Sequence, residues 1–141
     1  MIDWMDSMLR SWGHAKHRLM TSSEGAPQSI MGRIATYGPS AGESGHALQR
    51  FREGMTGDAL LCSLAIHRAF MAGKLTDRQY EVGVFVFYAC KGYTVRQKTR
   101  AMSLSTRGFY DLRDRAHENL APFFSNQAVF YSKEREGPLT H

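Results

Sequence analysis

The most patterned basic segment of this 141-residue chain runs from Thr94 to Leu120 and reads TVRQKTRAMSLSTRGFYDLRDRAHENL. Between Lys91 and Glu118, seven basic residues stand against three acidic ones, a surplus that nearly equals the net charge of +5 of the whole chain. Guanidinium groups bind phosphate oxygens, and they can donate two hydrogen bonds to the edge of a guanine base. The positive charge is therefore concentrated in a segment suited to contact with nucleic acid.

Two helices joined by a short break would position these side chains. The pattern predicts a short helix from Thr94 to Met102 and a tight break at Ser103 and Leu104. Ser105 is then suited to cap a second helix, because its hydroxyl can accept a hydrogen bond from a free backbone N–H of the first turn.

The second helix carries an apolar stripe. Its apolar residues recur at helical spacing, which places them on one face, and the helix is expected to end before Pro122. Such a pair makes the helix-turn-helix pattern, in which the N-terminal half of the second helix projects toward a major groove. The stripe consists of Phe109, Leu112, Ala116 and Leu120.

The helix-turn-helix prediction assigns roles to the polar residues. Arg107 is expected to reach a guanine edge or a phosphate, and Ser105 and Thr106 to donate to a phosphate. Basic residues of the first helix, with Lys91 before it, are expected to contact the DNA backbone without reading sequence. The alternative is a solvated helix face. The predicted DNA-binding residues are Arg96, Lys98, Arg100, Ser105, Thr106, Arg107, Tyr110 and Arg113.

The N-terminal part of the chain predicts one helix followed by a long loop. Residues 1–20 are expected to be helical, with Asp3 as N-cap. Residues 21–47, rich in Gly, Ser and Pro, predict a flexible loop with one anchored patch at residues 30–37.

Large apolar side chains lie on one face of the first predicted helix. Trp4, Met8 and Trp12 recur at four-residue spacing. Two interpretations stay open: this face packs on the protein's own core, or it binds a partner protein. Trp4, Met8 and Trp12 are therefore the candidate partner-binding residues.

The middle of the chain predicts two further helices. Residues 56–73 form one, with Thr56 or Asp58 as cap, Gly73 as terminator and a buried stripe at Leu60, Leu64 and Met71. Thr76 and Gln79 then make a capping box.

The segment after this capping box is ambiguous. The run from Val82 to Tyr88 has strand propensity, but the cap before it and the stop at Gly92 favour a helix. Beyond residue 120, a short helix is expected at residues 126–134, followed by a frayed end.

The remaining reactive residue types do not form a catalytic or metal-binding pattern. Cys62 and Cys90 are expected to be buried free thiols, as suits a reducing cytoplasm. His67 is expected to be a hydrogen-bonded core residue. His14 and His17, one turn apart, lack neighbouring ligands for a metal, and His117 is expected to pair with Asp114 on the surface. No enzyme activity, cofactor or metal is predicted.

Together these patterns predict an all-α fold. Residues 1–141 would form a single helical domain, with a helical core at 56–120, the helix-turn-helix at 94–120 and a C-terminal extension at 121–141. No apolar run is long enough to span a bilayer, so no membrane partner is expected.

The segment SLSTRGFYDLRDRAHENL resembles the helix-turn-helix of sigma-factor region 4, from which the chain departs at Lys98, Thr99, Ser103 and Gly108. The wider order, LRSWGHA, a loose segment, GDALLCSLA and then KGYTVRQKTRAM, resembles the Q-type late antiterminators of lambdoid phages. This resemblance implies a protein that binds double-stranded DNA near a late promoter, joins bacterial RNA polymerase and suppresses pausing and termination. Self-association on DNA and a location in the cytoplasm of a bacterial host are further expectations.

Two other functions remain as alternatives. One is a helix-turn-helix repressor or activator without antitermination activity. The other is a protein-interaction module whose arginine-rich helix binds an acidic protein surface.

Overall fold

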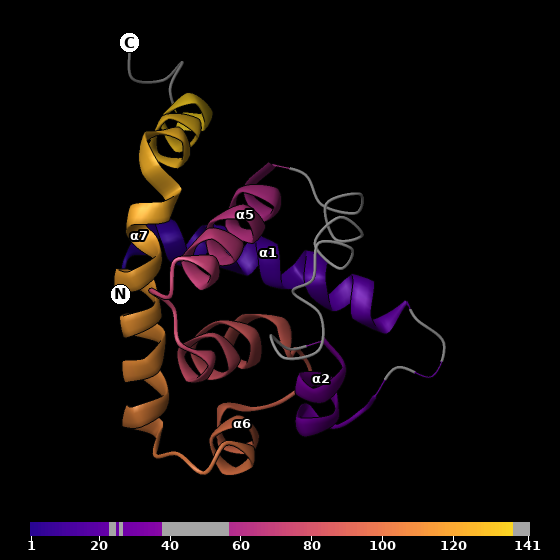
Figure 1. Ribbon diagram of the computed structural model, residues 1–141. Helices are drawn as coiled ribbons and strands as arrows, with labels where there is room; N and C mark the ends of the chain where they lie inside the picture. Colours follow the sequence, from indigo (N-terminus) through magenta and orange to yellow (C-terminus); the bar gives the residue numbers. More distant parts are fainter. Residues whose placement is uncertain (23–24, 26, 38–56, 137–141) are drawn as a thin grey trace.

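The computed structural model is all-helical, which confirms the predicted fold class (Figure 1). It describes residues 1–22, 25, 27–37 and 57–136, with side chains as far as residue 124. No helix in this part of the chain combines the length and apolar character needed to cross a bilayer. The helices are α1 (Asp3–Thr21), α2 (Ile30–Tyr37), α5 (Gly57–Met71), η1 (Gln79–Ala89), α6 (Val95–Ala101) and α7 (Thr106–Glu136).

The π-helix η1 is the most buried element and packs against both α1 and α7. The helix prediction for this segment is confirmed, but the backbone follows the wider π pattern, so that Cys90 N–H donates to the Phe85 carbonyl at 3.2 Å. Neighbours surround η1 on nearly every side, which explains why its sequence shows no amphipathic period.

Two glycines allow η1 to approach its neighbours closely. A Cβ atom at Gly13 of α1 would lie 2.1 Å from the Tyr88 carbonyl oxygen, and one at Gly83 would lie 2.5 Å from the Leu112 carbonyl oxygen. Real Cβ atoms do not approach so closely, so these backbones meet only because both positions lack a side chain. η1 thereby fixes α7 relative to α1.

The helix predicted at 56–73 is α5, but its buried face was wrongly predicted. Met71 is 76% exposed, and Leu60 and Leu64 are only half-buried. α5 packs against α1 and α7 through small side chains, which permit close contact between helices, while the two leucines lie at the edge of this face. Thr56, one of the two predicted caps, lies outside the described residues. The buried apolar residues of α5 are Ala59, Cys62, Ala65, Ile66 and Ala69.

The predicted N-cap of α1 is also wrong. Ile2 is the N-cap, and Asp3 is the first helical residue. The backbone N–H of Ile2 donates to Nδ1 of His117 at 3.1 Å, so a side chain of α7 satisfies a group at this helix end.

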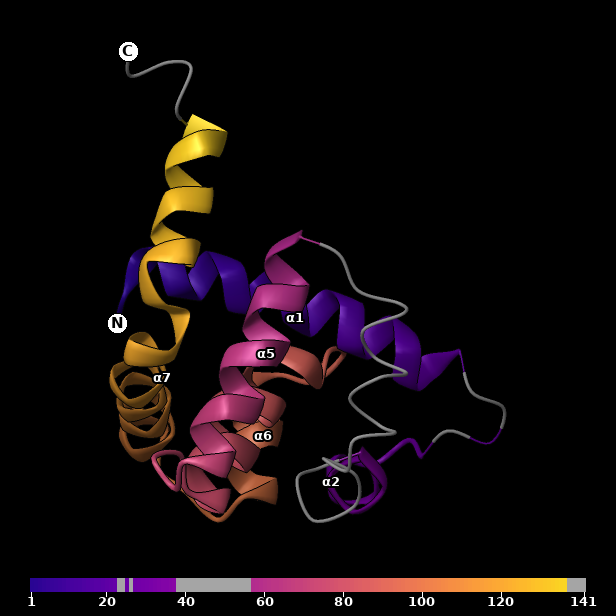
Figure 2. The ribbon, with the colours of Figure 1, turned by 45° about the horizontal axis from the view of Figure 1, so that its top comes forward.

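α7 does not end before Pro122 but continues to Glu136 with the proline inside it. A proline lacks the N–H of the helical ladder and clashes with the carbonyl of the preceding turn, which bends a helix. The ribbon of α7 changes direction along its length (Figure 2). The extension predicted at 121–141 is therefore continuous with α7 as far as residue 136, and residues 137–141 lie outside the described part.

Other local predictions are confirmed. Thr76 and Gln79 form the capping box, with both hydrogen bonds at 3.1 Å. The anchored patch is α2, and both cysteines are buried and free. The rest of the predicted loop at 21–47 falls largely on residues 23–24, 26 and 38–47, outside the described residues.

Candidate nucleic-acid interface

The capping box at the start of α6 sets the direction of the first of the two helices. Gln97 N–H donates to the Thr94 hydroxyl at 3.1 Å, while Thr94 N–H donates to the Gln97 side-chain oxygen at 2.8 Å. Two backbone donors that the helix leaves unpaired are thus satisfied by side chains. The sequence predicted the helix start at Thr94, but the reciprocal bond from Gln97 was missed.

The break between α6 and α7 is a tight turn. Ser103 has a φ of 55°, in the left-handed region, and Leu104 N–H donates to the Thr99 carbonyl at 2.9 Å. Arg78 reaches in from the start of η1 and donates to the Met102 carbonyl at 2.8 Å, which satisfies an acceptor at the C-terminal end of α6. This basic residue therefore supports the turn.

The start of α7 follows the predicted pattern. The Ser105 hydroxyl accepts a hydrogen bond from Gly108 N–H at 3.0 Å, as the predicted cap requires. Of the predicted stripe, Phe109, Ala116 and Leu120 are fully buried, and Leu112 is half-buried.

Packing beneath the first turn of α7 holds it in place. The Phe109 ring stacks on Phe87 of η1 with ring centroids 5.0 Å apart. Thr99 of α6 is also buried and donates its hydroxyl to the Arg96 carbonyl at 3.0 Å. The face opposite these contacts is left to the solvent.

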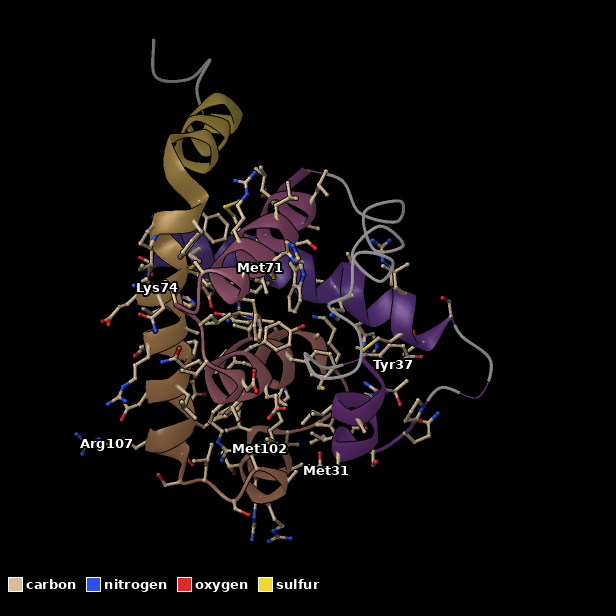
Figure 3. The ribbon with its side chains drawn as sticks, in the orientation of Figure 1. Met31, Tyr37, Met71, Lys74, Met102 and Arg107 are labelled. Atoms are coloured by element: carbon tan, nitrogen blue, oxygen red, sulfur yellow. The ribbon has the colours of Figure 1, made fainter. Side chains whose placement is uncertain are left out.

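The exposed residues of this region include basic and hydroxyl side chains. Thr106 and Arg107 lie on the outer side of the first turn of α7, and Figure 3 shows Arg107 directed away from the core. Arg96 and Arg100 of α6 and Ser105 are also exposed. These residues offer guanidinium and hydroxyl donors to phosphate oxygens, and Arg107 offers a fork that could also reach a base edge.

Lys98 does not belong to this exposed group, which corrects its predicted phosphate contact. Its ammonium donates to the Phe87 carbonyl at 3.1 Å, at the C-terminal end of η1. Burial lowers the pKa of Lys98, so this lysine already gives up part of its hydration to the fold. It stabilises the contact between η1 and α6.

Arg113 is likewise held within the protein rather than free for DNA, and its predicted role is corrected. Its side chain is 13% exposed and lies over the rings of Phe87 and Tyr110, at 5.1 and 5.0 Å from their centroids. It also donates to Asp114 at 2.9 Å. Tyr110 is half-buried in the same cluster, so its ring serves packing as well as any contact at the surface.

Comparisons with protein-family models, with curated proteins and with solved structures found no match.

The predicted partner-binding face of α1 packs on the protein's own core. Met8 and Trp12 are each 2% exposed, and the Trp12 ring contacts Tyr80 edge to face at 6.4 Å. Trp4 is half-buried and contacts Phe124 of α7 edge to face at 5.4 Å. This face is thus occupied within the chain, because α1 packs on α5, η1 and α7.

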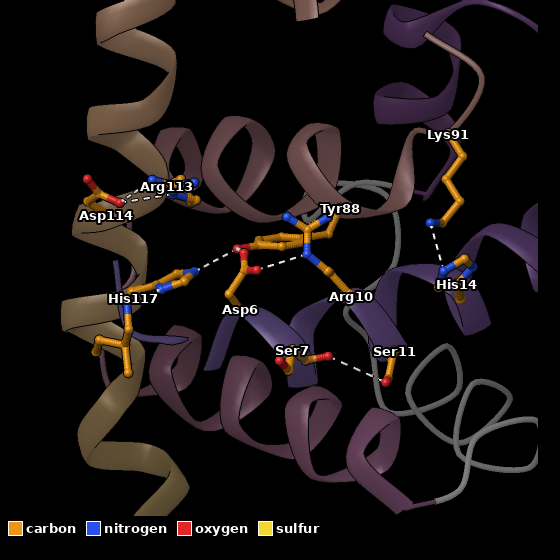
Figure 4. A network of polar contacts seen from close by, with 11 residues as sticks. Asp6, Ser7, Arg10, Ser11, His14, Tyr88, Lys91, Arg113, Asp114 and His117 are labelled. Atoms are coloured by element: carbon orange, nitrogen blue, oxygen red, sulfur yellow. Dashed lines mark hydrogen bonds and ion pairs between the residues drawn. The ribbon is translucent and has the colours of Figure 1, made fainter. Parts of the chain in front are cut away.

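A buried hydrogen-bond network centred on Tyr88 joins α1, η1 and α7, and no local pattern in the sequence indicates it (Figure 4). The Tyr88 hydroxyl donates to Asp6 at 2.6 Å and lies 2.8 Å from Nε2 of His117. Arg10 donates to the other oxygen of Asp6 at 2.8 Å. Although burial favours the neutral acid, the hydrogen bonds from Tyr88 and Arg10 hold the pKa of Asp6 below its usual value. His117 therefore contacts residues of α1 and η1 and is not a surface partner of Asp114. Its spacing to Asp114 in the sequence gives no information about these distant contacts.

The other histidines do not lie in a metal-binding arrangement. His67 is half-buried, and its Nδ1 has no hydrogen-bond partner within the described part of the chain, in contrast to the predicted hydrogen-bonded core residue. His17 contacts the Ala89 carbonyl at 3.2 Å, and His14 lies 3.2 Å from the Lys91 ammonium. Among residues 1–22, 25, 27–37 and 57–124, no group of three candidate ligands lies together.

Proposed function

We propose that this protein binds duplex DNA through α6, the turn and α7, used as a helix-turn-helix. The observation that carries the proposal is the position of Arg107, which is exposed on the first turn of α7 while Phe109, two residues on, anchors that turn in the core. A helix held in this way can present its N-terminal side chains to a major groove. Arg96 and Arg100 on α6 supply cations beside it for the DNA backbone.

We further propose that DNA binding serves late-gene transcription antitermination in a bacteriophage. The resemblance to Q-type antiterminators supports this step, because it extends from the first helix to the segment of α6 and α7. In this proposal the protein acts in the bacterial cytoplasm, binds next to a late promoter and associates with RNA polymerase, which then reads through terminators.

Transcription in vitro tests the proposal directly. A template with the cognate late promoter and an intrinsic terminator downstream is transcribed with and without the protein. Read-through is expected to rise with the wild-type protein and with Lys74→Gln, a matched charge change at an exposed residue outside α6 and α7, and to fall with Arg107→Gln. No gain in read-through from the folded wild-type protein contradicts antitermination.

Two further measurements separate the alternatives. If the protein leaves the complex once elongation starts, pull-down of halted elongation complexes will not recover it, and a promoter-bound regulator becomes the better explanation. If mobility shifts on genomic DNA stay negative at low salt, the DNA-binding proposal itself fails and a protein-interaction module replaces it.

A further inference from the structure

Several basic side chains surround the C-terminal end of η1, and two of them contact its carbonyls. Lys98 donates to the Phe87 carbonyl, and His17 lies 3.2 Å from the Ala89 carbonyl through Nδ1. Carbonyls in the last turn of a helix lack intrahelical partners and carry partial negative charge, so cations are stabilised there. These two side chains cap η1.

Three other basic side chains at this place have no such explanation. Among the described residues, the ammonium of Lys91 has one hydrogen-bond contact, with the imidazole nitrogen Nε2 of His14 at 3.2 Å, between α1 and the residues after η1 (Figure 4). Arg33 of α2 is 7% exposed, donates through Nε to the Pro27 carbonyl and lies over the Tyr93 ring, 5.3 Å from its centroid. Its Nη1 is buried and has no hydrogen-bond partner among the described residues.

The charges of these residues act on one another. Burial lowers the pKa of His17, and the charges of Arg33, Lys91 and His14 lower it further. Burial and the charge of Arg10 lower the pKa of Lys91. The ion pairs found in the described part of the chain involve neither Lys91 nor Arg33. The cluster therefore holds positive charge, from three separate segments, that no carboxylate of these segments neutralises.

We propose that His14, Lys91 and Arg33, together with His17, form a phosphate-binding site on the protein that is separate from the exposed arginines of α6 and α7. A phosphate group has several acceptor oxygens and can accept hydrogen bonds from an ammonium, an imidazole and a guanidinium at once. It would replace the contact between Lys91 and His14 by contacts with an anion.

A nucleic-acid strand is the source of phosphate that fits the surroundings. Lys91 lies four residues before α6 begins at Val95, and Lys98 of α6 donates to the Phe87 carbonyl of η1, so the cluster lies close to α6. Its positive charge thus continues from α6 onto α1 and α2, and α2 contacts α6 directly. This identification of the source rests on the proposed DNA-binding function, whereas the phosphate site itself does not.

Nuclear magnetic resonance with inorganic phosphate tests the site alone. The imidazole signals of His14 and His17 are expected to shift in a saturable way in the wild type, in Lys91→Arg and in the control Lys74→Gln. In Lys91→Gln the affinity for phosphate is expected to fall about tenfold, because a hydrogen bond to a charged group is lost. Phosphate should also raise the pKa of His17, since an anion stabilises its charged form. Absence of a saturable shift in the folded wild type, or equal affinity of Lys91→Gln and Lys74→Gln, overturns the site.

The salt dependence of DNA binding tests the source of the phosphate. With a duplex that spans the binding site, Lys91→Gln is expected to make the slope of log K against log[salt] shallower by about one unit, as for one lost phosphate contact, while Lys74→Gln leaves it unchanged. A saturable phosphate shift with an unchanged DNA slope overturns the nucleic-acid source. If the wild type binds phosphate but no DNA, the proposed DNA-binding function fails while the phosphate site stands.

Discussion

The Tyr88 hydroxyl of η1 lies 2.8 Å from Nε2 of His117 in α7, and the opposite ring nitrogen of His117 accepts the Ile2 N–H of α1. Since Nδ1 is an acceptor, the neutral ring carries its proton on Nε2 and donates to Tyr88, which in turn donates to Asp6. His117 and Tyr88 thus each accept one hydrogen bond and donate one, and the Asp6 carboxylate accepts at the end of the chain. The network therefore specifies how α7 sits against α1 and η1.

The first prediction concerns the acid sensitivity of this network. Burial lowers the pKa of His117 from 6.5 to about 4, and the Arg113 charge acts in the same direction. Between these values the unfolded chain binds a proton that the folded protein does not, so stability falls as the pH falls from 6.5 to about 4. The slope contributed by His117 is at most about 1.4 kcal/mol per pH unit. Urea unfolding at pH 7, 6 and 5 measures it.

A variant isolates the contribution of His117 from that of His17, whose pKa is also lowered. His117→Gln should be less stable than the wild type at pH 7, but its stability should change less between pH 7 and pH 5. Equal slopes for the two proteins would show that His117 is not the responsible group.

The second prediction concerns the close contact between η1 and α7. Gly83→Ala places a Cβ atom 2.5 Å from the Leu112 carbonyl oxygen, and neither backbone can yield without moving a helix. The free energy of unfolding is expected to fall by about 1–3 kcal/mol or more. Thermal and urea unfolding measure the loss.

Gly108→Ala is the matched comparison. There the nearest atom to the new Cβ would be the Ser105 hydroxyl oxygen, at 3.2 Å, which belongs to a side chain. Alanine also gains about 1 kcal/mol over glycine within a helix, so the stability should change little or rise. Equal losses from Gly83→Ala and Gly108→Ala would contradict this account of the contact.

The third prediction separates Lys98 from the exposed arginine on the same helix. Lys98→Gln removes a donor to the Phe87 carbonyl and should lower stability by about 1 kcal/mol, the usual contribution of a buried hydrogen bond, or somewhat more. Arg96→Gln should leave stability nearly unchanged but weaken binding to all DNA sequences, with a shallower salt dependence. A larger effect of Lys98→Gln than of Arg96→Gln on the salt slope would refute the structural role of Lys98.

The fourth prediction concerns sequence reading by Arg107. Arg107→Gln is expected to reduce discrimination between specific and random DNA by about 1–3 kcal/mol, as for the loss of one bidentate contact with a base. Competition binding with the two DNAs at one salt concentration measures it. Equal losses on specific and random DNA would show that Arg107 contacts only phosphate.

Local signals in the sequence predicted some of the helix starts. The capping pairs at Thr76 and Gln79 and at Ser105 lie within four residues of their partners, so their chemistry is readable without the fold. The buried Phe109 and Ala116 followed from helical spacing alone.

Contacts between residues far apart in the sequence could not be predicted from local patterns. His117 pairs with Ile2 and Tyr88, far away in the chain, and Lys98 donates to a carbonyl of the preceding helix. In the sequence, both look like ordinary surface residues of basic helices. Pro122 was taken as a stop because local rules disfavour proline inside a helix, but α7 continues through it.

Because α7 continues through Pro122, the length of this helix sets the distance between its two ends. Its 31 residues, at a rise of 1.5 Å each, give a path of about 46 Å. That is longer than one turn of B-DNA, about 34 Å. A molecule held at the Thr106 end and another held at the Glu136 end are therefore related by the length of α7 and by its change of direction. The surface that binds one end of α7 therefore limits how far the other end of α7 extends.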